Sequence, residues 1–577
     1  MSRHLITTDD ESTWKFDRPV VFLGKWCLNE SRREVWQSLD YSVVDPVSIE
    51  HALTDLYRQA QILNSHLSSD LASALNSFHG LTFSNRYWKV ITGPWLRSFC
   101  DNLIFRWAYI NQAISEFNAN ESHSNFDDAQ LGSHPRNFLE YRNSQKQQAW
   151  NQFVYSKMWS LMSNSELPAL RANSTGTSNT QAEIWESKEK QFSGRRAILT
   201  DTYIPRLPEA VLSILMRSQP TPGRRVAPPI ATFDPQSRSQ LEFRTEPISR
   251  LHAIARELVR DQILTAYVEG YRALLELVPR LRLPETPSLI FTSNRHLYDD
   301  VFNAWVAQAI ENGSKYFIGQ HGGHYGLSRF PSFSELHEDD ISDFYLTWGW
   351  KETAKQLPGP CLKTIGKRYR GPGQSNQLLI VCDHLWKYPR SLFQDITEQV
   401  GYLEYVGGCV TGLPANIQTD VLIRLNHAHD ETGSSQLEWW RENVPTIAID
   451  DGLGDMQEVV GKSRLVVTTY NGATLLETLN LNIPTLITWD ESYVQLRPEA
   501  LSFLHQLKEV GVFHGNQASF VRHVTMHWDD IGSWWNSEPV QSARKSFCAQ
   551  YSRKDSHPLL YLRRTLKIES AAGSPTS

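Results

Sequence analysis

The sequence predicts an α/β protein with a doubly wound parallel sheet in its C-terminal half and a β-α-β unit before it. From residue 377 onward, short apolar runs alternate with helical stretches, which is typical of a parallel sheet with helices on both faces. In the preceding part, "PSLIFTS" (287–293), "HLYDDVFNAWVAQAIENG" (296–313) and "KYFIG" (315–319) indicate a strand, a helix and a second strand. A parallel sheet is therefore expected in both halves.

The N-terminal half is expected to be mostly helical. Trp, Phe and Leu recur at helical spacing over about residues 48–165. Polar or Pro-rich composition predicts surface segments at 163–183 and 218–238. The other predicted elements are a buried strand in "RPVVFLGKW" (18–26), a helix through "RREVWQSL" (32–39) and one amphipathic helix over 249–277.

The C-terminal half begins after a basic linker with Gly and Pro near residues 366–376. We predict an N-terminal domain over 1–365, a C-terminal domain over 377–570 and a disordered tail over 571–577. The predicted strands are "DFYLTWGW" (343–350) before the linker, and "QLLIVCD" (377–383), "DVLIRL" (420–425), "TIAID" (446–450), "RLVVTTY" (464–470) and "IPTLITW" (483–489) after it.

Composition excludes several classes of protein. A chain of 577 residues is too long for one core, so two or three domains are expected. The net charge of −6 does not support nucleic-acid binding. Six cysteines without a C-x-x-C pair argue against a zinc site or a disulfide scaffold and fit a reducing compartment. The N-terminus has no apolar signal-peptide region and no run is long enough to span a bilayer, so we expect a cytoplasmic protein. We also expect no cofactor.

The stretch "QHGGHYG" (320–326) follows the second strand of the β-α-β unit. In open α/β sheets, ligands bind at the carboxyl ends of the strands. Glycine leaves room for a ligand, and histidine transfers protons near neutral pH. We predict His321 as the general base, with Glu338 as the alternative base or as the group that orients His321. The simpler alternatives are a polar turn for the glycines and a solvated loop for the acidic run at 338–340.

A second stretch, "TTYNGATLLETL" (468–479), indicates a strand followed by a helix. We predict that Asn471 caps a helix that begins at Gly472, with its leucines packed inward and Glu477 facing outward. A helix N-terminus attracts phosphate, and Glu477 lies about 9 Å further along the axis, where it could bind ribose hydroxyls. The alternative is an ordinary capped helix with one exposed glutamate.

Several stretches resemble glycosyltransferases of the GT-B fold, in which two Rossmann-like domains face each other across the active site. The resemblance extends to an uncharacterised family, assigned as transferases, that is encoded among surface-polysaccharide genes. The stretches that carry it are "FLGKWCL" (22–28), "RYWKVITGPWL" (86–96), "FRWAYI" (105–110), "QHGGHYG", "HEDDISDFYLTWGW" (337–350) and "TTYNGATLLETL". For "RYWKVITGPWL" we predict a packing role, with acceptor binding as the alternative.

The resemblance implies a nucleotide-activated donor, either an NDP-sugar or a CMP-ulosonic acid, bound by the C-terminal domain. It implies a glycan or lipid-linked acceptor and leaves peripheral contact with the inner face of the membrane open. The predicted substrate-binding residues are Gln320, Gly322, Gly323, His324, Arg424, Thr469, Asn471, Gly472, Thr474 and Glu477.

The stretch "VLIRLNHAH" (421–429) departs from related enzymes, which often carry a His-Pro element there. Ala428 follows His427, so Arg424, His427 and His429 are only candidates for phosphate contact. No D-x-D motif ends a strand, so we predict no metal. A nucleotide-sugar epimerase, a polyol-phosphate transferase and a non-catalytic nucleotide-binding protein remain as alternative functions.

Overall fold

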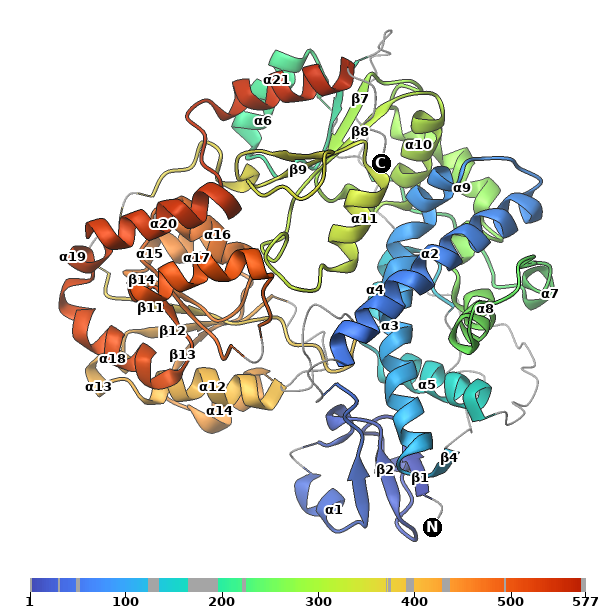
Figure 1. The fold of residues 1–577 in the computed structure, drawn as a ribbon, viewed down its shortest axis with the longest axis horizontal. Coiled ribbons are helices and arrows are strands. Elements are labelled where there is room, and N and C mark those ends of the chain that lie inside the picture. Colours follow the sequence, from blue (N-terminus) through green and yellow to red (C-terminus); the bar gives the residue numbers. More distant parts are fainter. Residues whose placement is uncertain are drawn as a thin grey trace.

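Three parallel sheets form the framework of the described residues in the computed structural model (Figure 1). The structure describes residues 3–29, 32–47, 52–122, 134–163, 196–220, 225–369, 371, 375–390, 399–427, 436–491 and 494–571. Several predicted features lie outside these residues. They are residues 164–183 of the insertion, His429, positions 370 and 372–374 of the linker, and the tail from 572.

The C-terminal sheet has the strand order β13-β12-β11-β14-β15-β16, and all its neighbouring strands are parallel. In chain order this is 3-2-1-4-5-6, the order of a doubly wound Rossmann sheet. Every strand predicted after residue 377 is present, and only the two-residue β16 was not expected. The strands are β11 (Leu378–Val381), β12 (Val421–Arg424), β13 (Ala448–Asp450), β14 (Leu465–Thr468), β15 (Thr485–Thr488) and β16 (Phe513–His514).

The second six-stranded sheet has the order β10-β9-β8-β7-β5-β6, again entirely parallel. In chain order this is 2-1-3-4-5-6, the other common doubly wound arrangement. Two such sheets confirm the predicted GT-B type of fold. The strands are β5 (Ile198–Leu199), β6 (Gln219–Pro220), β7 (Leu289–Thr292), β8 (Lys315–Gly319), β9 (Phe344–Thr347) and β10 (Gln356–Pro358); β5, β6 and β10 were not predicted.

The third sheet, of order β3-β2-β1-β4, was not predicted at all. The strand predicted at 18–26 is β2, which therefore belongs to this separate sheet rather than to the six-stranded one. The strands are β1 (Arg3–Ile6), β2 (Val20–Phe22), β3 (Tyr41–Val43) and β4 (Ala119–Ser122). The domain boundaries at 365 and 377 remain a prediction.

The helical elaboration between the first two sheets of the chain is present as predicted. Its long helix α3 packs against α2, α10 and α11 and reaches β4 at its other end (Figure 1). The helices are α1 (Arg33–Gln37), α2 (Ala52–His79), α3 (Asn85–Ser115), α4 (Phe138–Ser144), α5 (Gln148–Ser163), α10 (Asp300–Glu311) and α11 (Phe333–Ile341).

The single helix predicted over 249–277 is wrong. The chain forms α8 (Arg250–Gln262) and α9 (Tyr271–Leu277), with an irregular segment between them. In that segment the backbone N–H groups of Thr265 and Ala266 donate to the carbonyls of Pro135 and Arg136 at 3.3 and 3.0 Å. These tertiary hydrogen bonds replace the helical ones, so amphipathic spacing alone overestimated the helix. Residues 225–234 of the predicted Pro-rich loop are irregular, as expected, before the short α7 (Pro235–Arg238).

The end of the chain returns to the N-terminal half. Helix α21 (Pro558–Ala571) packs against α6 (Arg206–Met216) at the top of the molecule in Figure 1. Tyr561 and Arg553 both donate to the carbonyl of Pro358, at 2.6 and 3.0 Å. The other helices are α12 (Gln399–Thr411), α13 (Ala415–Gln418), α14 (Gln436–Asn443), α15 (Met456–Lys462), α16 (Ala473–Asn480), α17 (Pro498–Glu509), α18 (Gln517–His527), α19 (Ile531–Trp535) and α20 (Glu538–Tyr551). No helix in the described part of the chain has the length and apolar composition that crossing a bilayer requires.

Candidate active site

The loop 320–326 leaves the sheet at the carboxyl end of β8, and Gln320 holds it there. The buried amide oxygen of Gln320 accepts from the backbone N–H of Trp348 and from Nε1 of Trp350, both at 2.8 Å. Its amide nitrogen donates to the carbonyl of Gly322 at 2.9 Å. Gln320, predicted to bind substrate, thus has its side chain engaged in anchoring the loop.

His321 and Glu338 form a close pair. Nδ1 of His321 lies 3.2 Å from Oε1 of Glu338; the histidine side chain is 17% exposed and the glutamate is fully buried. Glu338 lies on α11, so the alternative of a solvated loop for the acidic run is wrong. The helix forms because Ser332 caps it, accepting from the backbone N–H of Glu335 at 3.2 Å.

Further hydrogen bonds surround the Glu338 carboxylate. His296 and Tyr325 contact Oε1, each at 3.2 Å, and Tyr345 donates to Oε2 at 3.1 Å. Burial by itself raises the pKa of Glu338, but the charge of His321 and the hydrogen bonds from His296 and His321 outweigh it and hold the pKa at about 2. The carboxylate is therefore ionised and enclosed, which suits it to orient His321 rather than to contact substrate.

Besides Glu338, the hydroxyl of Tyr325 lies near the ring of His321, 3.4 Å from each of its two nitrogens. When Nδ1–H donates to Glu338, Nε2 carries the ring's lone pair and is the nitrogen that accepts a proton. Tyr203 lies beside it, with ring centroids 5.8 Å apart. Tyr203 has a φ of +63°, and Asn294 donates to its hydroxyl at 3.0 Å. A non-glycine residue in this left-handed region is held there by its surroundings, which is common at functional sites.

His324 and Gly322 shape the loop. Nε2 of His324 lies 3.0 Å from the hydroxyl of Ser332. Burial and the nearby charge of His321 lower the pKa of His324 to about 3, so this histidine is neutral at physiological pH. A Cβ on Gly322 would lie 2.7 Å from the ring of Tyr325, so the glycine leaves space for that tyrosine.

Gly323 brings the loop against the second predicted site. A Cβ on Gly323 would lie 2.0 Å from the carbonyl carbon of Gly472, at the N-terminus of α16. Beside this contact, Nδ2 of Asn471 donates to the hydroxyl of Ser328 at 3.2 Å. Asn471 does not cap α16 as predicted: the helix starts at Ala473, and Gly472 occupies the cap position without a side-chain hydrogen bond. Asn471 instead joins the two halves of the chain.

Arg497 holds the same junction from the C-terminal side. Its Nε donates to the carbonyl of Ser328 at 3.0 Å, and its Nη2 lies 2.7 Å from Oε1 of Glu335 on α11. The helix that carries Glu338 and the region that carries α16 are therefore tied together.

Glu477 faces a lysine from the other half of the chain. Nζ of Lys363 lies 3.1 Å from Oε1 of Glu477, and the side chains are 24% and 21% exposed, so Glu477 is less exposed than predicted. The same Nζ is 5.0 Å from the ring centroid of Tyr203, which links the pair to His321. The predicted inward leucines of α16 are buried, namely Leu475, Leu476 and Leu479.

A cavity of about 290 Å³ opens beside Thr474 and Glu477. It lies between the start of the predicted linker, α15 and α16, and cations and apolar side chains share its wall. The lining residues are Lys367, Arg368, Tyr369, Gly371, Met456, Gln457, Val460, Gly461, Thr474, Glu477, Thr478, Leu481 and Ile483.

Arg424 and Thr469 are engaged in internal hydrogen bonds. The buried guanidinium of Arg424 pairs with Asp450, and its Nη2 donates to the carbonyl of Gly452 at 3.1 Å. The hydroxyl of Thr469 donates to the carbonyl of Val381 at 2.9 Å and lies 2.6 Å from that of Tyr402. These contacts stabilise the strand ends of the C-terminal sheet.

Sequence reasoning missed three residues of this site: Tyr203, His296 and Lys363. None of them lies in a stretch whose composition or spacing is distinctive, and only the tertiary structure brings them to His321, Glu338 and Glu477. The packing role predicted for "RYWKVITGPWL" is confirmed, because a Cβ on Gly93 would lie 2.4 Å from the ring of His337, the residue before Glu338. Within the described residues, no group of three or more His, Cys, Asp or Glu side chains is arranged to hold a metal ion.

Comparison with solved structures gives distant similarities. A Listeria monocytogenes protein described as a UDP-N-acetylglucosamine 2-epimerase is 12% identical, over 56% of this chain and 86% of its own, with a TM-score of 0.33. The wall teichoic acid polymerase TagF is 10% identical, over 49% and 72%, with a TM-score of 0.27. A mutant O-GlcNAc transferase of Thermobaculum terrenum is 11% identical, over 91% and 99%, with a TM-score of 0.31.

No curated protein matches the sequence significantly. The model of one protein family, described as the LIC12162 family transferase, matches residues 3–566. The match includes all three sheets and both sides of the candidate site. The chain therefore belongs to the LIC12162 family of transferases.

Proposed function

We propose that this transferase is a glycosyltransferase that moves a sugar from a nucleotide-activated donor to a hydroxyl of a glycan or lipid-linked acceptor of a surface polysaccharide. The observation that carries the proposal is the position of the His321–Glu338 pair. It lies where the carboxyl end of β8 meets the N-terminus of α16, beside Lys363 and Glu477. A base, a cation and a helix N-terminus thus meet at the junction of two doubly wound sheets.

The donor nucleotide, an NDP-sugar or a CMP-ulosonic acid in this proposal, binds on the C-terminal side. The cavity beside Thr474 and Glu477 has Lys367 and Arg368 in its wall, which are suited to phosphate oxygens. Glu477 accepts one hydrogen bond from Lys363, and a carboxylate has further acceptor positions for ribose hydroxyls. Because Gly323 covers one side of the α16 N-terminus, the phosphates approach that terminus from the side of Thr474.

The transfer step uses both sides of the junction. Nε2 of His321 accepts the proton of the acceptor hydroxyl while its oxygen bonds to the anomeric carbon and the bond from that carbon to the phosphate oxygen breaks. The ionised Glu338 stabilises the imidazolium that forms. Lys363 offsets the negative charge on the departing phosphate.

The first test is a thermal-shift screen with UDP, GDP, CDP and CMP, followed by calorimetry with the nucleotide that stabilises the protein most. We expect one of them to raise the melting temperature. A protein that binds none of them contradicts the proposal.

Product analysis with the matching activated sugar then identifies the reaction. A product that forms only when an acceptor is added supports transfer. A sugar altered without an acceptor indicates an epimerase instead. Transfer of a polyol phosphate to the acceptor from a nucleotide-activated polyol, with release of the nucleoside monophosphate, indicates a polyol-phosphate transferase.

A further inference from the structure

Helix α6 is apolar on the side that faces solvent. Leu207, Val211 and Ile214 recur at spacings of four and three residues, which places them on one stripe. Their exposed fractions are 81%, 47% and 77%, while Leu212 and Met216 on the opposite side are buried. A surface helix normally turns a polar face to water. This outer stripe therefore offers an apolar contact surface.

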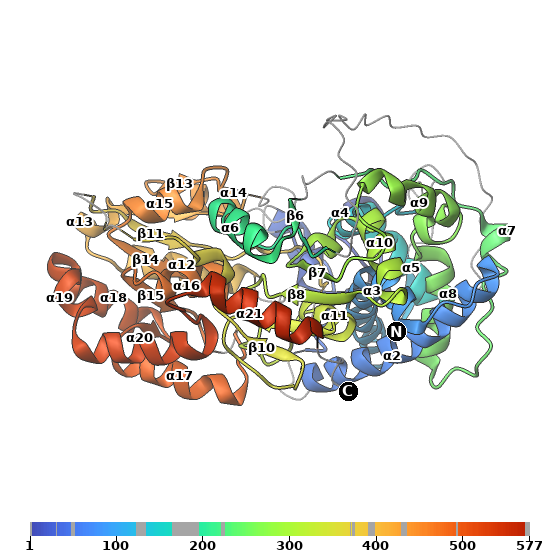
Figure 2. The same ribbon diagram turned by 90° about the horizontal axis from the view of Figure 1, so that it is seen from above.

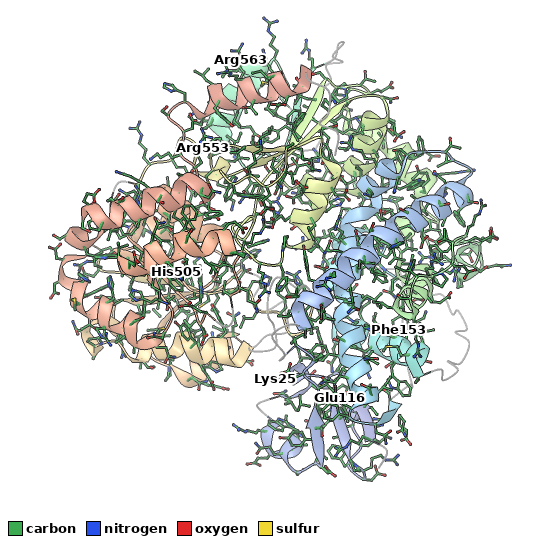
Figure 3. All side chains as sticks on the ribbon, in the orientation of Figure 1. Lys25, Glu116, Phe153, His505, Arg553 and Arg563 are labelled. Carbon is green, nitrogen blue, oxygen red and sulfur yellow. The ribbon has the colours of Figure 1, made fainter. Side chains whose placement is uncertain are left out.

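The neighbouring helix adds cations to the same surface. Helix α21 packs along α6, and Figure 2 looks down on the two of them. Arg563, Arg564 and Lys567 of α21 are exposed, and Arg563 extends from the upper edge of the molecule in Figure 3. Among the described residues of this region, the salt bridge that forms is between Arg553 and Asp555 and involves none of these three cations. Leu560 and Ile568, 53% and 52% exposed, lie on the same helix.

We propose that the surface formed by α6 and α21 binds peripherally to an anionic lipid bilayer. The apolar stripe of α6 enters the boundary between headgroups and acyl chains, and the cations of α21 contact the acidic headgroups. An apolar helix face combined with Arg and Lys is the combination that interfacial membrane binding requires.

Charge favours a bilayer over a second copy of the chain as the occupant. In a two-fold contact through this surface, the α21 cations of one copy would approach those of the other, because such an interface is self-complementary. Like charges brought together oppose association. An anionic bilayer instead complements both the apolar and the cationic parts.

The position of α6 relates the surface to the candidate site. The helix begins at Arg206, three residues after Tyr203, whose ring lies beside His321. A Cβ on Gly366 would lie 2.9 Å from Cγ of Pro208 on α6, so α6 packs against the start of the predicted linker. Docking through α6 would hold the site close to the membrane, although binding to lipid does not depend on the transfer reaction.

Vesicle co-sedimentation tests the apolar part. We expect the full chain to bind vesicles of phosphatidylcholine with 30% phosphatidylglycerol, and to bind phosphatidylcholine vesicles much more weakly. The double variant Leu207→Gln, Ile214→Gln should bind the anionic vesicles about tenfold more weakly or worse, because each apolar group withheld from the bilayer reduces affinity. The matched control is Met526→Gln on α18, a residue 70% exposed, which should bind like the parent.

A second variant tests the cationic part. Arg563→Ala with Arg564→Ala should weaken binding by about fivefold for each charge removed, and the dependence on salt should decrease with it. Arg522→Ala, which removes an exposed arginine from α18, is the control. Circular dichroism and melting temperature of all variants should match the parent, because the substituted side chains are exposed.

The proposal is overturned if the parent does not distinguish anionic from neutral vesicles, or if both surface variants bind like their controls. It is also overturned if light scattering shows a dimer that Leu207→Gln with Ile214→Gln converts to a monomer, because a second copy would then cover the stripe.

Discussion

The two sides of the candidate site are built differently. On the β8 side, Glu338 is enclosed by four hydrogen-bonding side chains, and Gln320 is fully engaged in holding the loop. On the α16 side, Glu477 and Lys363 stay partly exposed beside a cavity of about 290 Å³. The first side is prepared for proton transfer, and the second retains space and charge for a ligand. Substitutions on the two sides should therefore affect different quantities.

The largest expected effect is on turnover, at His321. A general base contributes about 10²–10⁴-fold to the rate, so His321→Ala should lower kcat by about that factor. Nucleotide affinity should remain, because the nucleotide is assigned to the other side. Steady-state kinetics and calorimetry measure the two quantities separately. His505→Ala, on the exposed face of α17 (Figure 3), is the control and should change neither.

Glu338→Gln examines the partner of His321. The variant keeps the shape but loses the charge that stabilises the imidazolium, so kcat should fall while nucleotide affinity stays. If Glu338→Gln loses all turnover while His321→Ala keeps it, the carboxylate is the base. His321 is then a residue that lines the site. If both variants fail to fold, the loop 320–326 is a structural turn.

The next largest effect concerns the contact between the two sides. In Gly323→Ala the new methyl group would lie 2.0 Å from the carbonyl carbon of Gly472, so the loop and α16 must separate. Overpacking of this kind costs about 1–3 kcal/mol, which should lower the melting temperature. Gly454→Ala is the matched control, because a Cβ there has no atom within 4 Å. If Gly323→Ala melts like this control, the two sides are not in contact in solution.

Acid should lower the free energy of unfolding through two buried histidines, His324 in the N-terminal half of the site and His514 in β16. Burial lowers the pKa of His324 to about 3 and that of His514 to about 4, from 6.5 in the unfolded chain. Below pH 6.5 the unfolded chain therefore binds protons that the folded chain does not. The free energy of unfolding should fall by about 1.4 kcal/mol per pH unit for each such histidine, down to its folded pKa.

Urea unfolding between pH 7 and 5 measures this slope. His324→Gln should make the slope shallower, because it removes the group whose pKa burial lowers. Equal slopes for the parent and His324→Gln would show that His324 takes up a proton in the folded protein over the same pH range. Below pH 4.5 the lowered pKa of Glu338, about 2, adds a further loss of the same sign.

Much of this architecture was predictable because its strands are long enough to show a pattern. The strands that escaped prediction in the six-stranded sheets, β5, β6, β10 and β16, have two or three residues, which is too few for an apolar run to stand out. The N-terminal sheet was missed for another reason: β2 was predicted as a strand, but β4 pairs with β1 from about a hundred residues away along the chain. Local patterns do not reveal such pairings.

The candidate site was predictable in its motifs but not in its contacts. The positions of His321 and Glu477 followed from strand ends and helix starts. That Glu338 is a buried partner of His321, and that Lys363 pairs with Glu477, depends on side chains brought together from separate elements. Asn471 shows the limit of a local rule: its type suits a helix cap, but a tertiary hydrogen bond to Ser328 engages it instead.

The smallest expected effect is on nucleotide affinity, at Glu477. If its carboxylate binds ribose hydroxyls, Glu477→Gln should weaken nucleotide binding by about tenfold, since a hydrogen bond to a charged group is worth about 1.5 kcal/mol or more. Lys363→Met removes the partner charge, so the double variant measures by calorimetry how far the two effects are coupled. The control is Glu458→Gln, which breaks an exposed pair with Lys462 on α15 and should leave affinity unchanged. Nucleotide binding at parent strength in Glu477→Gln would rule out the ribose assignment and leave Glu477 as the partner of Lys363 across the junction.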